Sequence, residues 1–342
     1  MGFIKKIKDF VTGGEENIPV LSICMMGPRS VGKTTVLTSI FAESQDKIGE
    51  GSNIYLRSGD DTTAQLNDYY LMLVDAVEKK NAANLPASNV QSKFLFELGL
   101  RGNSNASVRL SIQDFPGEYL NGRKEERQYV YDFMSGATVI LIAIDTPYLM
   151  EDKGKYNEQK NQVSIVTHYL KDNISAVKDK LVLFVPLKCE RYAHDRQIEG
   201  VTSKVEATYG ELIEFFKKNN IASVITPIQT LGGMEFDHME DNTSGLGGIK
   251  KIAVYRPWAT KPQYRPLYCP QPLYYLLTYV SNHYEWLKKQ DKGFIDNLKS
   301  SIYSFFKKDT KFLEEMKKMS KYILYDKNGF KLVTTNNILK IN

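Results

Sequence analysis

One short stretch near the start of the chain has the residue types and the spacing of a loop that binds phosphate groups. It runs Gly27-Pro28-Arg29-Ser30-Val31-Gly32-Lys33-Thr34 and fits the pattern G-x-x-x-x-G-K-[S/T]. In this pattern glycines let backbone N–H groups surround phosphate oxygens, a lysine reaches the β- and γ-phosphates, and a hydroxyl binds Mg²⁺. We therefore assign phosphate contact and catalysis to Lys33 and Mg²⁺ ligation to Thr34. The other predicted contacts to the nucleotide phosphates are Gly27, Ser30, Val31, Gly32 and Thr35.

The segments on either side of this loop favour the same interpretation. The apolar run 20–26 is typical of a buried strand, and residues 35–41 begin a helical pattern. The alternative is an ordinary glycine turn, which needs no strand before it and no helix after it. A strand, a glycine-rich loop and a helix in this order predict that the N-terminus of the helix faces the phosphate.

A second motif, Asp114-Phe115-Pro116-Gly117, follows the predicted strand 107–113. A carboxylate at the end of a strand can hold the Mg²⁺ shell, and the N–H group of a following glycine can sense the γ-phosphate. Asp114 is therefore our second candidate metal ligand, and Gly117 is a candidate nucleotide contact. The alternative is a surface turn, in which Asp, Pro and Gly are common.

A third motif, Val185-Pro186-Leu187-Lys188-Cys189-Glu190, lies at the end of another apolar strand. Together with the first two motifs it resembles the P-loop GTPases of the translation-factor class, whose strand-end N/T-K-x-D motif recognises guanine. The resemblance implies that Lys188 lies along the base. It also implies that the Glu190 carboxylate accepts hydrogen bonds from guanine N1–H and the exocyclic amine.

The chain departs from this family pattern at two positions. Leu187 stands where the family has Asn or Thr, and Glu190 stands where it has Asp. The last guanine-side loop of the family would fall near residues 230–232. The alternative for the third motif is an exposed lysine and an exposed glutamate after a strand.

The same resemblance implies GTP or GDP and Mg²⁺ as ligands, and it assigns further roles to individual residues. Ser88 is the candidate for a further Mg²⁺ ligand, with Thr62 or Thr63 as alternatives. Glu118 stands where the family orients the attacking water. Arg29 lies inside the phosphate loop, where an arginine finger acting in cis would stabilise the transition state. The alternative is an arginine that faces solvent.

The composition is that of an ordinary globular protein from a reducing compartment. The chain has 342 residues, of which 25% are charged and 42% hydrophobic, and its net charge is +5. This mild charge gives no strong reason to expect a nucleic-acid partner. The three cysteines show no C-x-x-C spacing and the four histidines no metal-ligand spacing, so we expect no zinc site. Without a long apolar segment, we expect a cytoplasmic protein, with association at a membrane surface as an alternative.

Alternating apolar strands and amphipathic helices predict an α/β fold of the P-loop NTPase type. We expect a three-layer, mostly parallel sheet with helices on both faces and a helical C-terminal appendage. The expected strands are 20–26, 54–56, 92–101, 107–113, 138–145, 181–186 and 223–227. The expected helices begin at 35 and cover 61–82, 122–135, 156–175, 203–219 and 271–289.

The chain is predicted to have three parts. Residues 1–17 form a basic amphipathic helix, which packs on its own domain or docks on a membrane or partner. Residues 18–290 form the nucleotide-binding domain, with a helical insertion at 58–88 and a second insertion at 232–270. Residues 291–342 form a C-terminal helix and a small hairpin around Lys327-Asn328-Gly329.

A finer resemblance rests on Asp114 to Glu118, Pro186 to Glu190 and Gln271-Pro272-Leu273. These segments are similar to the bacterial double-GTPase branch, often found beside genes of biological conflict systems. The resemblance implies slow, Mg²⁺-dependent GTP hydrolysis, used as a switch on an unknown protein effector or at a membrane, with a nucleotide-dependent dimer. Two alternatives remain, an ATPase or small-molecule kinase and a non-hydrolysing scaffold that binds nucleotide for stability.

Overall fold

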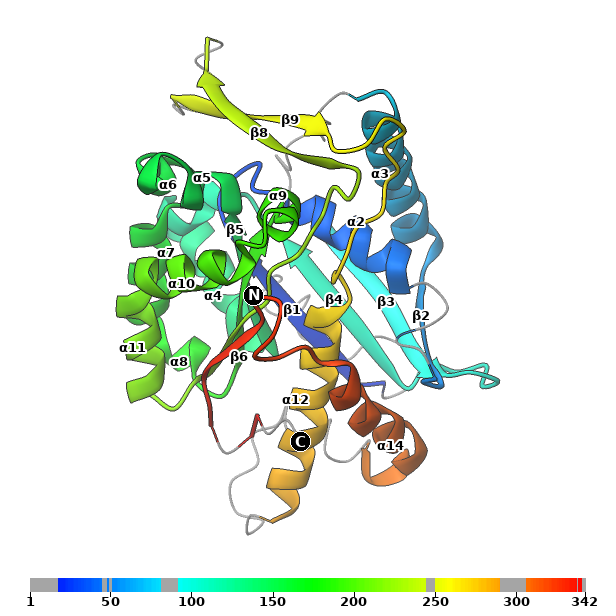
Figure 1. Ribbon diagram of the computed structural model, residues 1–342. Coiled ribbons are helices and arrows are strands. Elements are labelled where there is room, and N and C mark those ends of the chain that lie inside the picture. Colours follow the sequence, from blue (N-terminus) through cyan, green and yellow to red (C-terminus); the bar gives the residue numbers. More distant parts are fainter. Residues whose placement is uncertain are drawn as a thin grey trace.

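The computed structural model describes residues 18–44, 48, 51–80, 92–243, 250–289, 306–336 and 338–339. The predicted helix over 1–17 and the candidate metal ligand Ser88 lie outside the described residues. Within them, the chain forms one large sheet covered by helices and a separate two-stranded hairpin (Figure 1).

The large sheet has eight strands in the order β10-β7-β6-β5-β1-β4-β3-β2. They are β1 (Val20–Met26), β2 (Ile54–Ser58), β3 (Ser92–Leu100), β4 (Val108–Asp114), β5 (Val139–Asp145), β6 (Leu181–Leu187), β7 (Ala222–Ile225) and β10 (Lys331–Thr334). The strands from β7 to β4 run parallel, whereas β10, β3 and β2 pair antiparallel with their neighbours. The carboxyl ends of β1, β4, β5 and β6 therefore share one edge, which is where ligands bind in open α/β sheets.

The central strands β5 and β6 are apolar over almost their whole length, because both faces of the sheet are covered. Every residue of β5 and β6 is buried. Successive side chains of a strand enter two separate cores. In β1, Ile23 and Met25 belong to one core, and Cys24 and Met26 belong to the other. The prediction of a mostly parallel sheet between two helical layers is confirmed.

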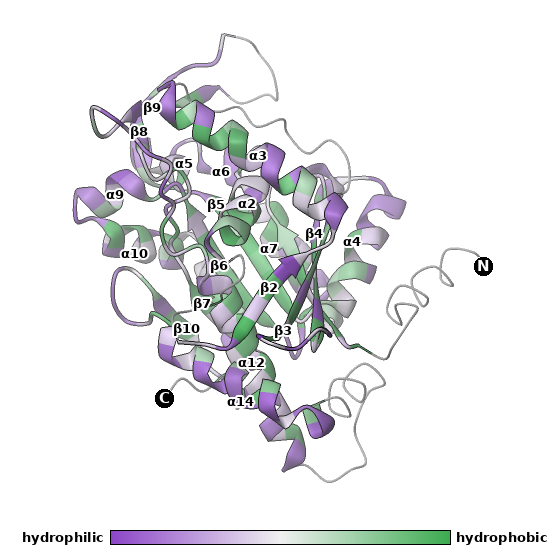
Figure 2. Ribbon diagram, turned by 90° about the vertical axis from the view of Figure 1, so that its right-hand side faces the viewer, coloured by the Kyte–Doolittle hydropathy of each residue, from purple (hydrophilic) through white to green (hydrophobic). Residues whose placement is uncertain are grey.

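Each face of the sheet has its own set of helices. One face is covered by α2 (Lys33–Ser44), α12 (Gln271–Lys288), α14 (Thr310–Lys318) and η4 (Met319–Tyr322). The other is covered by η1 (Gly117–Asn121), α4 (Lys124–Gly136), α5 (Thr146–Met150), α7 (Val163–Asp172), α8 (Ile174–Val177), α9 (Glu190–His194), α10 (Ile198–Thr208) and α11 (Gly210–Lys218). Figure 2 shows strands that are mainly hydrophobic and helices with both colours, as expected for helices that bury one face. Among the described helices, none is long and apolar enough to cross a membrane.

The segment predicted as one helix over 156–175 is divided into α6 (Asn157–Asn161), α7 and α8. The first break falls at Gln162, which has a left-handed φ of 50°. A residue in this conformation cannot continue an α-helix, so α6 takes a direction of its own. The predicted helix 203–219 is likewise divided, into α10 and α11, on either side of Tyr209.

Two further segments complete the fold, one helix that packs on α2 and adds Leu66 to the first core, and one hairpin outside the large sheet. Helix α3 (Asp60–Glu78) follows β2, and the antiparallel strands β8 (Met234–Asp241) and β9 (Lys251–Pro257) form the separate hairpin. In Figure 1 this hairpin lies at the top of the view, above α5, α6 and α9.

The C-terminal strand differs from the small hairpin that we predicted around Lys327-Asn328-Gly329. A tight turn is present, with a bridge between Lys327 and Phe330. The strand that follows it, β10, pairs with β7 rather than with a strand of its own. This part of the chain therefore extends the main sheet.

Candidate nucleotide-binding site

The phosphate loop connects β1 to α2 at the carboxyl edge of the sheet. The backbone turns through left-handed conformations at Gly27 (φ 146°), Ser30 (φ 58°) and Gly32 (φ 114°). At Gly27 a Cβ atom would also lie 3.0 Å from the carbonyl oxygen of Ala143 in β5. Glycine is therefore required at this position both by conformation and by space.

Lys33 is the first residue of α2, and its side chain returns over the loop that precedes it. Its Nζ donates hydrogen bonds to the carbonyl oxygens of Gly27 (2.9 Å) and Pro28 (3.1 Å). The same nitrogen lies 3.6 Å from Asp114 Oδ1. Burial lowers the pKa of Lys33, and the neighbouring Asp114 carboxylate opposes this shift. The ammonium group is thus held against the loop, where it can meet phosphate oxygens.

Thr34 and Asp114 bring two oxygen ligands together beside Lys33. Thr34 Oγ1 donates to Asp114 Oδ2 at 3.4 Å, and the two residues are only 8% and 1% exposed. Mg²⁺ prefers oxygen ligands and is commonly held by one or two protein groups together with phosphate and water. The hydroxyl and the carboxylate fit such a site.

Gly117 begins η1 and packs directly on the phosphate loop. A Cβ atom at this position would lie 2.5 Å from Pro28 Cα and 2.7 Å from the Gly27 carbonyl oxygen. No side chain fits there without moving the backbone. Glycine is therefore required where η1 meets the phosphate loop.

Arg29 and Glu118 lie at the outer rim of the same site. Arg29 Nη1 is 4.0 Å from Glu118 Oε1, and the side chains are 51% and 58% exposed. An exposed ion pair of this kind contributes at most about 1 kcal/mol. Both side chains can therefore rearrange around a ligand at little cost.

The remaining predicted contacts of the loop differ in their surroundings. Val31 is fully buried, whereas Ser30 is exposed. Thr35 is partly exposed, and its carbonyl oxygen accepts a hydrogen bond from Ser39 Oγ at 2.8 Å. The side chain of Val31 belongs to the core, so a phosphate contact at this position can only be made by its backbone.

The two alternatives to Ser88 are engaged away from the phosphate loop. Thr62 Oγ1 accepts a hydrogen bond from the Leu95 N–H at 3.3 Å. Thr63 Oγ1 and Ser58 Oγ share a hydrogen bond of 2.6 Å. Both hydroxyls connect α3 to β2 and β3 in this structure.

Lys188 joins the end of β6 to the end of β5. Its Nζ donates to Asp145 Oδ2 at 2.6 Å, and Asp145 is fully buried. The Lys188 Cε atom lies 3.7 Å from the point that a Cβ on Gly32 would occupy. Lys188 therefore lies beside the phosphate loop, on the side opposite Asp114 in the strand order.

Glu190 is the first residue of α9, and it is fully buried. Its Oε1 accepts hydrogen bonds from the N–H groups of Leu231 (2.5 Å) and Gly232 (3.1 Å). Within the described parts of the chain, Oε2 has no hydrogen-bond partner. Burial raises the pKa of Glu190 to about 7, and the backbone N–H groups oppose this shift. The structure thus brings the predicted loop near 230–232 to Glu190 and leaves one carboxylate oxygen for a ligand.

Asp145 is one residue that the sequence analysis did not identify. Asn161 fixes its backbone, because Asn161 Oδ1 accepts from the Asp145 N–H at 2.8 Å and Asn161 Nδ2 donates to the Asp145 carbonyl at 3.1 Å. The sequence did mark this position, because Asp145 directly follows the apolar run 137–144, which predicts a buried strand. The carboxyl ends of parallel strands carry ligand-binding groups in such sheets.

Lys160 in α6 is the second residue that sequence analysis missed. Its Nζ donates to the carbonyl oxygens of Ser30 (3.1 Å) and Arg29 (3.4 Å) in the phosphate loop. Burial lowers the pKa of Lys160 to about 8. The chain has many helical lysines and nothing in the sequence around Lys160 marks it, so only the fold places it at the loop.

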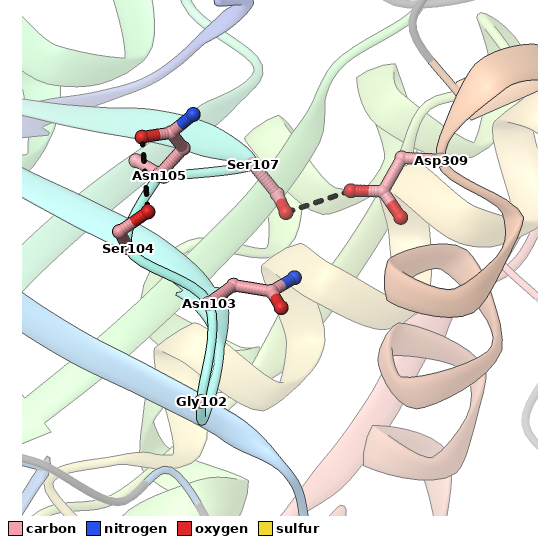
Figure 3. Close-up of a pocket in the computed structure, with 7 residues that line it drawn as sticks. Gly102, Asn103, Ser104, Asn105, Ser107 and Asp309 are labelled. Carbon is pink, nitrogen blue, oxygen red and sulfur yellow. Dashed lines mark hydrogen bonds between the residues drawn. The ribbon is translucent and has the colours of Figure 1, made fainter.

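A separate cavity of about 340 Å³ lies at the opposite end of β3 and β4 (Figure 3). It is lined by the turn 102–107 and by Asp309, which precedes α14. Asp309 Oδ2 accepts from Ser107 Oγ at 2.8 Å, and Oδ1 accepts from the Phe312 N–H at 3.0 Å. Because β4 begins beside this cavity and ends at Asp114, the cavity is not part of the nucleotide site.

Several solved structures match the structure of this chain at low sequence identity. The GTPase-like domain of S. cerevisiae Ski7 bound to GTP is 16% identical, with 84% of this chain and 54% of that chain covered and a TM-score of 0.41. Sup35 complexed with GDP is 11% identical, with 74% and 45% covered and a TM-score of 0.34. The bacterial dynamin GTPase LeoA from ETEC is 14% identical, with 57% and 37% covered and a TM-score of 0.26. The chain spans about half or less of these structures, so none of them carries an argument about function.

Sequence comparison is more informative. No curated protein matches the chain closely enough to be counted as a relative. The family model named Double-GTPase 2 does match, over residues 21–225, which is more than half of the chain. The matched region contains the phosphate loop and the motifs that end in Gly117 and Glu190. This chain therefore belongs to the Double-GTPase 2 family.

Proposed function

We propose that this protein binds GTP with Mg²⁺, hydrolyses it slowly and acts as a nucleotide-controlled switch. The observation that carries the proposal is the meeting of Lys33, Thr34, Asp114 and Gly117 at one end of the sheet. A buried cation, two oxygen ligands and a glycine in contact with the loop are the groups that phosphoryl chemistry requires. Membership of a GTPase family supports the same reading.

On the phosphate side, each residue has a distinct task. Lys33 exchanges its bonds to the Gly27 and Pro28 carbonyls for phosphate oxygens, which its ammonium group binds more strongly because they are charged. Thr34 and Asp114 hold Mg²⁺, which neutralises charge on the β- and γ-phosphates when bound. The N-terminus of α2 adds backbone N–H groups and a favourable dipole.

On the base side, Lys188 and Glu190 favour guanine over adenine. Guanine offers an N1 proton and an amine to a carboxylate, whereas adenine offers neither at this edge. A hydrogen bond to a charged group contributes roughly 1.5–3 kcal/mol, and stranding a buried acceptor costs a similar amount. Glu190 Oε2, buried and without a hydrogen-bond partner among the described residues, supports this role.

For hydrolysis, Arg29 and Glu118 are the candidates that can reach the γ-phosphate from the rim. Arg29 would stabilise charge in the transition state, and Glu118 would orient the attacking water. The negative charge of Glu118 near the phosphate is consistent with slow turnover. The contact between Gly117 and the phosphate loop couples hydrolysis to movement of η1.

As a switch, the protein would engage a protein effector or a membrane in one nucleotide state, and a nucleotide-dependent dimer is part of the same proposal. A more specific version of this proposal is a role in a bacterial conflict or defence system. That version rests on the sequence resemblance alone. Pull-down with GTP-locked and GDP-loaded protein, read by mass spectrometry, tests for the effector.

Calorimetric titration with GTP, ATP and xanthosine triphosphate tests the nucleotide assignment. We expect wild type to bind GTP at least about a hundredfold more tightly than ATP, and Lys33→Ala to abolish tight binding. Lys79→Ala is the matched control, because Lys79 is an exposed lysine paired with Asp75 on α3. Glu190→Asn should shift the preference towards xanthosine triphosphate. Equal binding of ATP and GTP by wild type would instead favour an ATPase or kinase.

Phosphate release separates the switch from a non-hydrolysing scaffold. We expect slow but measurable turnover by wild type and none above background by Lys33→Ala. Tight GTP binding without any turnover, with or without a captured partner, would support the scaffold.

A further inference from the structure

The β8–β9 hairpin is fixed to the two helices that follow the base-side strands. Tyr148 of α5 donates from its hydroxyl to the Lys251 carbonyl oxygen at 2.8 Å. Arg191 of α9 donates from Nη1 to the Asp237 carbonyl oxygen at 2.7 Å. In the sequence, α5 directly follows Asp145 and α9 begins at Glu190, so each anchoring helix starts at or next to a buried carboxylate; Figure 1 shows the hairpin above both helices.

A second set of contacts fixes the hairpin to α9 through side chains. His194 Nδ1 lies 2.9 Å from Glu235 Oε2. Arg256 binds the other oxygen of Glu235 with two nitrogens, at 3.1 and 3.0 Å. The Trp258 ring stacks on the His194 ring with a centroid distance of 4.1 Å. The hairpin is therefore held in one position by both of its strands.

The residues that lead into β8 are also bonded to α9. Glu190 accepts the N–H groups of Leu231 and Gly232. A Cβ atom on Gly232 would lie 2.4 Å from the backbone of Arg265, and one on Gly233 would lie 2.4 Å from the Gln263 carbonyl oxygen. The chain entering β8 is thus tightly packed and bonded to the predicted base-reading carboxylate.

This anchoring brings Tyr255 of β9 to the base-side groups. The Lys188 Nζ lies 5.8 Å from the centre of the Tyr255 ring, and the Phe236 ring supports it edge-on at 6.4 Å. Burial raises the pKa of Tyr255 well above its ordinary value, and the charges of Asp145 and Glu190 raise it further. The same Lys188 Nζ lies 2.6 Å from Asp145 Oδ2, so the tyrosine lies beside this ion pair.

Three buried polar atoms belong to residues grouped around Lys188, namely its ion-pair partner at 2.6 Å, the tyrosine whose ring centre lies 5.8 Å from Nζ, and the glutamate two residues further along the chain. They are Tyr255 Oη from β9, Asp145 Oδ1 from β5 and Glu190 Oε2 from α9, and none has a hydrogen-bond partner among the described residues. Buried polar atoms normally have partners, so a group of unpartnered ones indicates a missing ligand. A ligand that satisfies them must have polar edges, and it must have a flat face to lie against an aromatic ring and a lysine stem.

We propose that Tyr255 is a specificity-determining residue that stacks on the nucleobase, so that the β8–β9 hairpin forms one wall of the nucleotide site. This inference rests on the proposed function, because it assumes that a nucleotide occupies the phosphate loop. A purine has the required flat faces and polar edges. The ring of Tyr255 covers one face of the base, and the aliphatic part of Lys188 covers the other.

The inference predicts a loss of affinity that is confined to the base. Stacking between an aromatic side chain and a base is worth about fivefold to a hundredfold in affinity when the ring is truncated to alanine. Tyr255→Ala should therefore weaken GTP binding by this factor. Tyr255→Phe keeps the ring and loses only the hydroxyl, so its loss should be smaller than that of Tyr255→Ala and at most about tenfold. Inorganic tripolyphosphate has no base, so its affinity should be unchanged in both variants.

The test is titration of wild type, Tyr255→Ala and Tyr255→Phe with Mg²⁺ and either GTP or inorganic tripolyphosphate. Ile252→Ala is the matched control, because Ile252 lies on the same strand and is 38% exposed. Circular dichroism melting checks that each variant is folded. A selective loss of GTP binding in Tyr255→Ala, with a smaller loss in Tyr255→Phe and none in Ile252→Ala, supports the inference.

Three other outcomes overturn it, and they are distinguishable. Equal losses for GTP and tripolyphosphate would show that Tyr255 only supports the fold. Tighter GTP binding by Tyr255→Ala would show that the ring obstructs the site. If wild type itself binds GTP no better than tripolyphosphate, the proposed function fails and the inference fails with it.

Discussion

The Lys188 ammonium group lies 2.6 Å from the Asp145 carboxylate, in an ion pair that joins the ends of β6 and β5. Asp145 is fully buried and the Lys188 side chain is 16% exposed. Burial of two charges carries a large desolvation cost, so removal of one partner leaves an uncompensated charge. The pair holds Lys188 beside the phosphate loop, which makes Asp145 a positioning residue for the base side.

Asp145→Ala should therefore lower the free energy of unfolding by about 3–5 kcal/mol. Asp241→Ala is the control, because the pair between Asp241 and Lys251 is spaced at 3.0 Å but Asp241 is 82% exposed. Its loss should cost less than about 1 kcal/mol. Urea denaturation of both variants measures the difference. Similar values for the two would contradict a role for burial.

Gly117→Ala should abolish tight GTP binding, because the added Cβ would lie 2.5 Å from Pro28 Cα and displace the phosphate loop. Gly136→Ala tests the same chemical change where nothing lies within 4 Å of the new Cβ. That variant should bind GTP as wild type does, and calorimetric titration compares the two. Normal binding by folded Gly117→Ala would show that η1 and the loop move independently.

The affinity for GTP should fall as the pH is lowered through about 7, the pKa to which burial raises Glu190. Only the deprotonated carboxylate accepts both guanine hydrogen bonds, so below this pKa a proton must leave before the base binds. The limit is a tenfold loss in affinity for each pH unit below the pKa. Glu190→Gln cannot titrate, and its residual GTP affinity should vary only as the phosphates of GTP do. Parallel pH profiles for the two proteins would argue against base reading by Glu190.

The contribution of Glu190 to the stability of the unliganded protein should instead fall as the pH rises. Glu190 has a higher pKa when folded than its ordinary value of 4.5, so the folded state binds more protons between 4.5 and about 7. Its contribution to stability is fully present below 4.5 and is lost as the pH rises through 7. Comparing the urea midpoints of wild type and Glu190→Gln over this range measures it.

Arg29→Ala should lower the turnover number by about 10³-fold if the guanidinium acts as a finger in cis. The affinity for GTP should change much less, because the ground state lacks the charge that the finger stabilises. Arg123→Ala is the control, since Arg123 is an exposed arginine in an ion pair with Glu126. Single-turnover phosphate release separates the effects, and a fully active Arg29→Ala would end the assignment.

The sequence by itself predicted the residues of the phosphate side. Gly27, Lys33 and Thr34 act within one loop, so their spacing in the chain is nearly their spacing in space. The strand before and the helix after the loop were visible in local periodicity, as were β5 and β6, whose continuous apolar runs follow from burial on both faces. Ser88 stays a prediction outside the described residues.

Only the tertiary structure decided the base side. Asp145, Lys188 and Tyr255 lie on three separate elements, and they meet because β5 and β6 are neighbours and because the hairpin is anchored on α5 and α9. Lys160 contacts the phosphate loop from α6, a short helix that the sequence predicted as part of a longer one. Such contacts depend on strand order and on helix breaks, which leave no periodic trace in the sequence. The pairing of β10 with β7 could not be predicted from the sequence either. A strand of four residues has too few alternating positions to indicate which strand it pairs with.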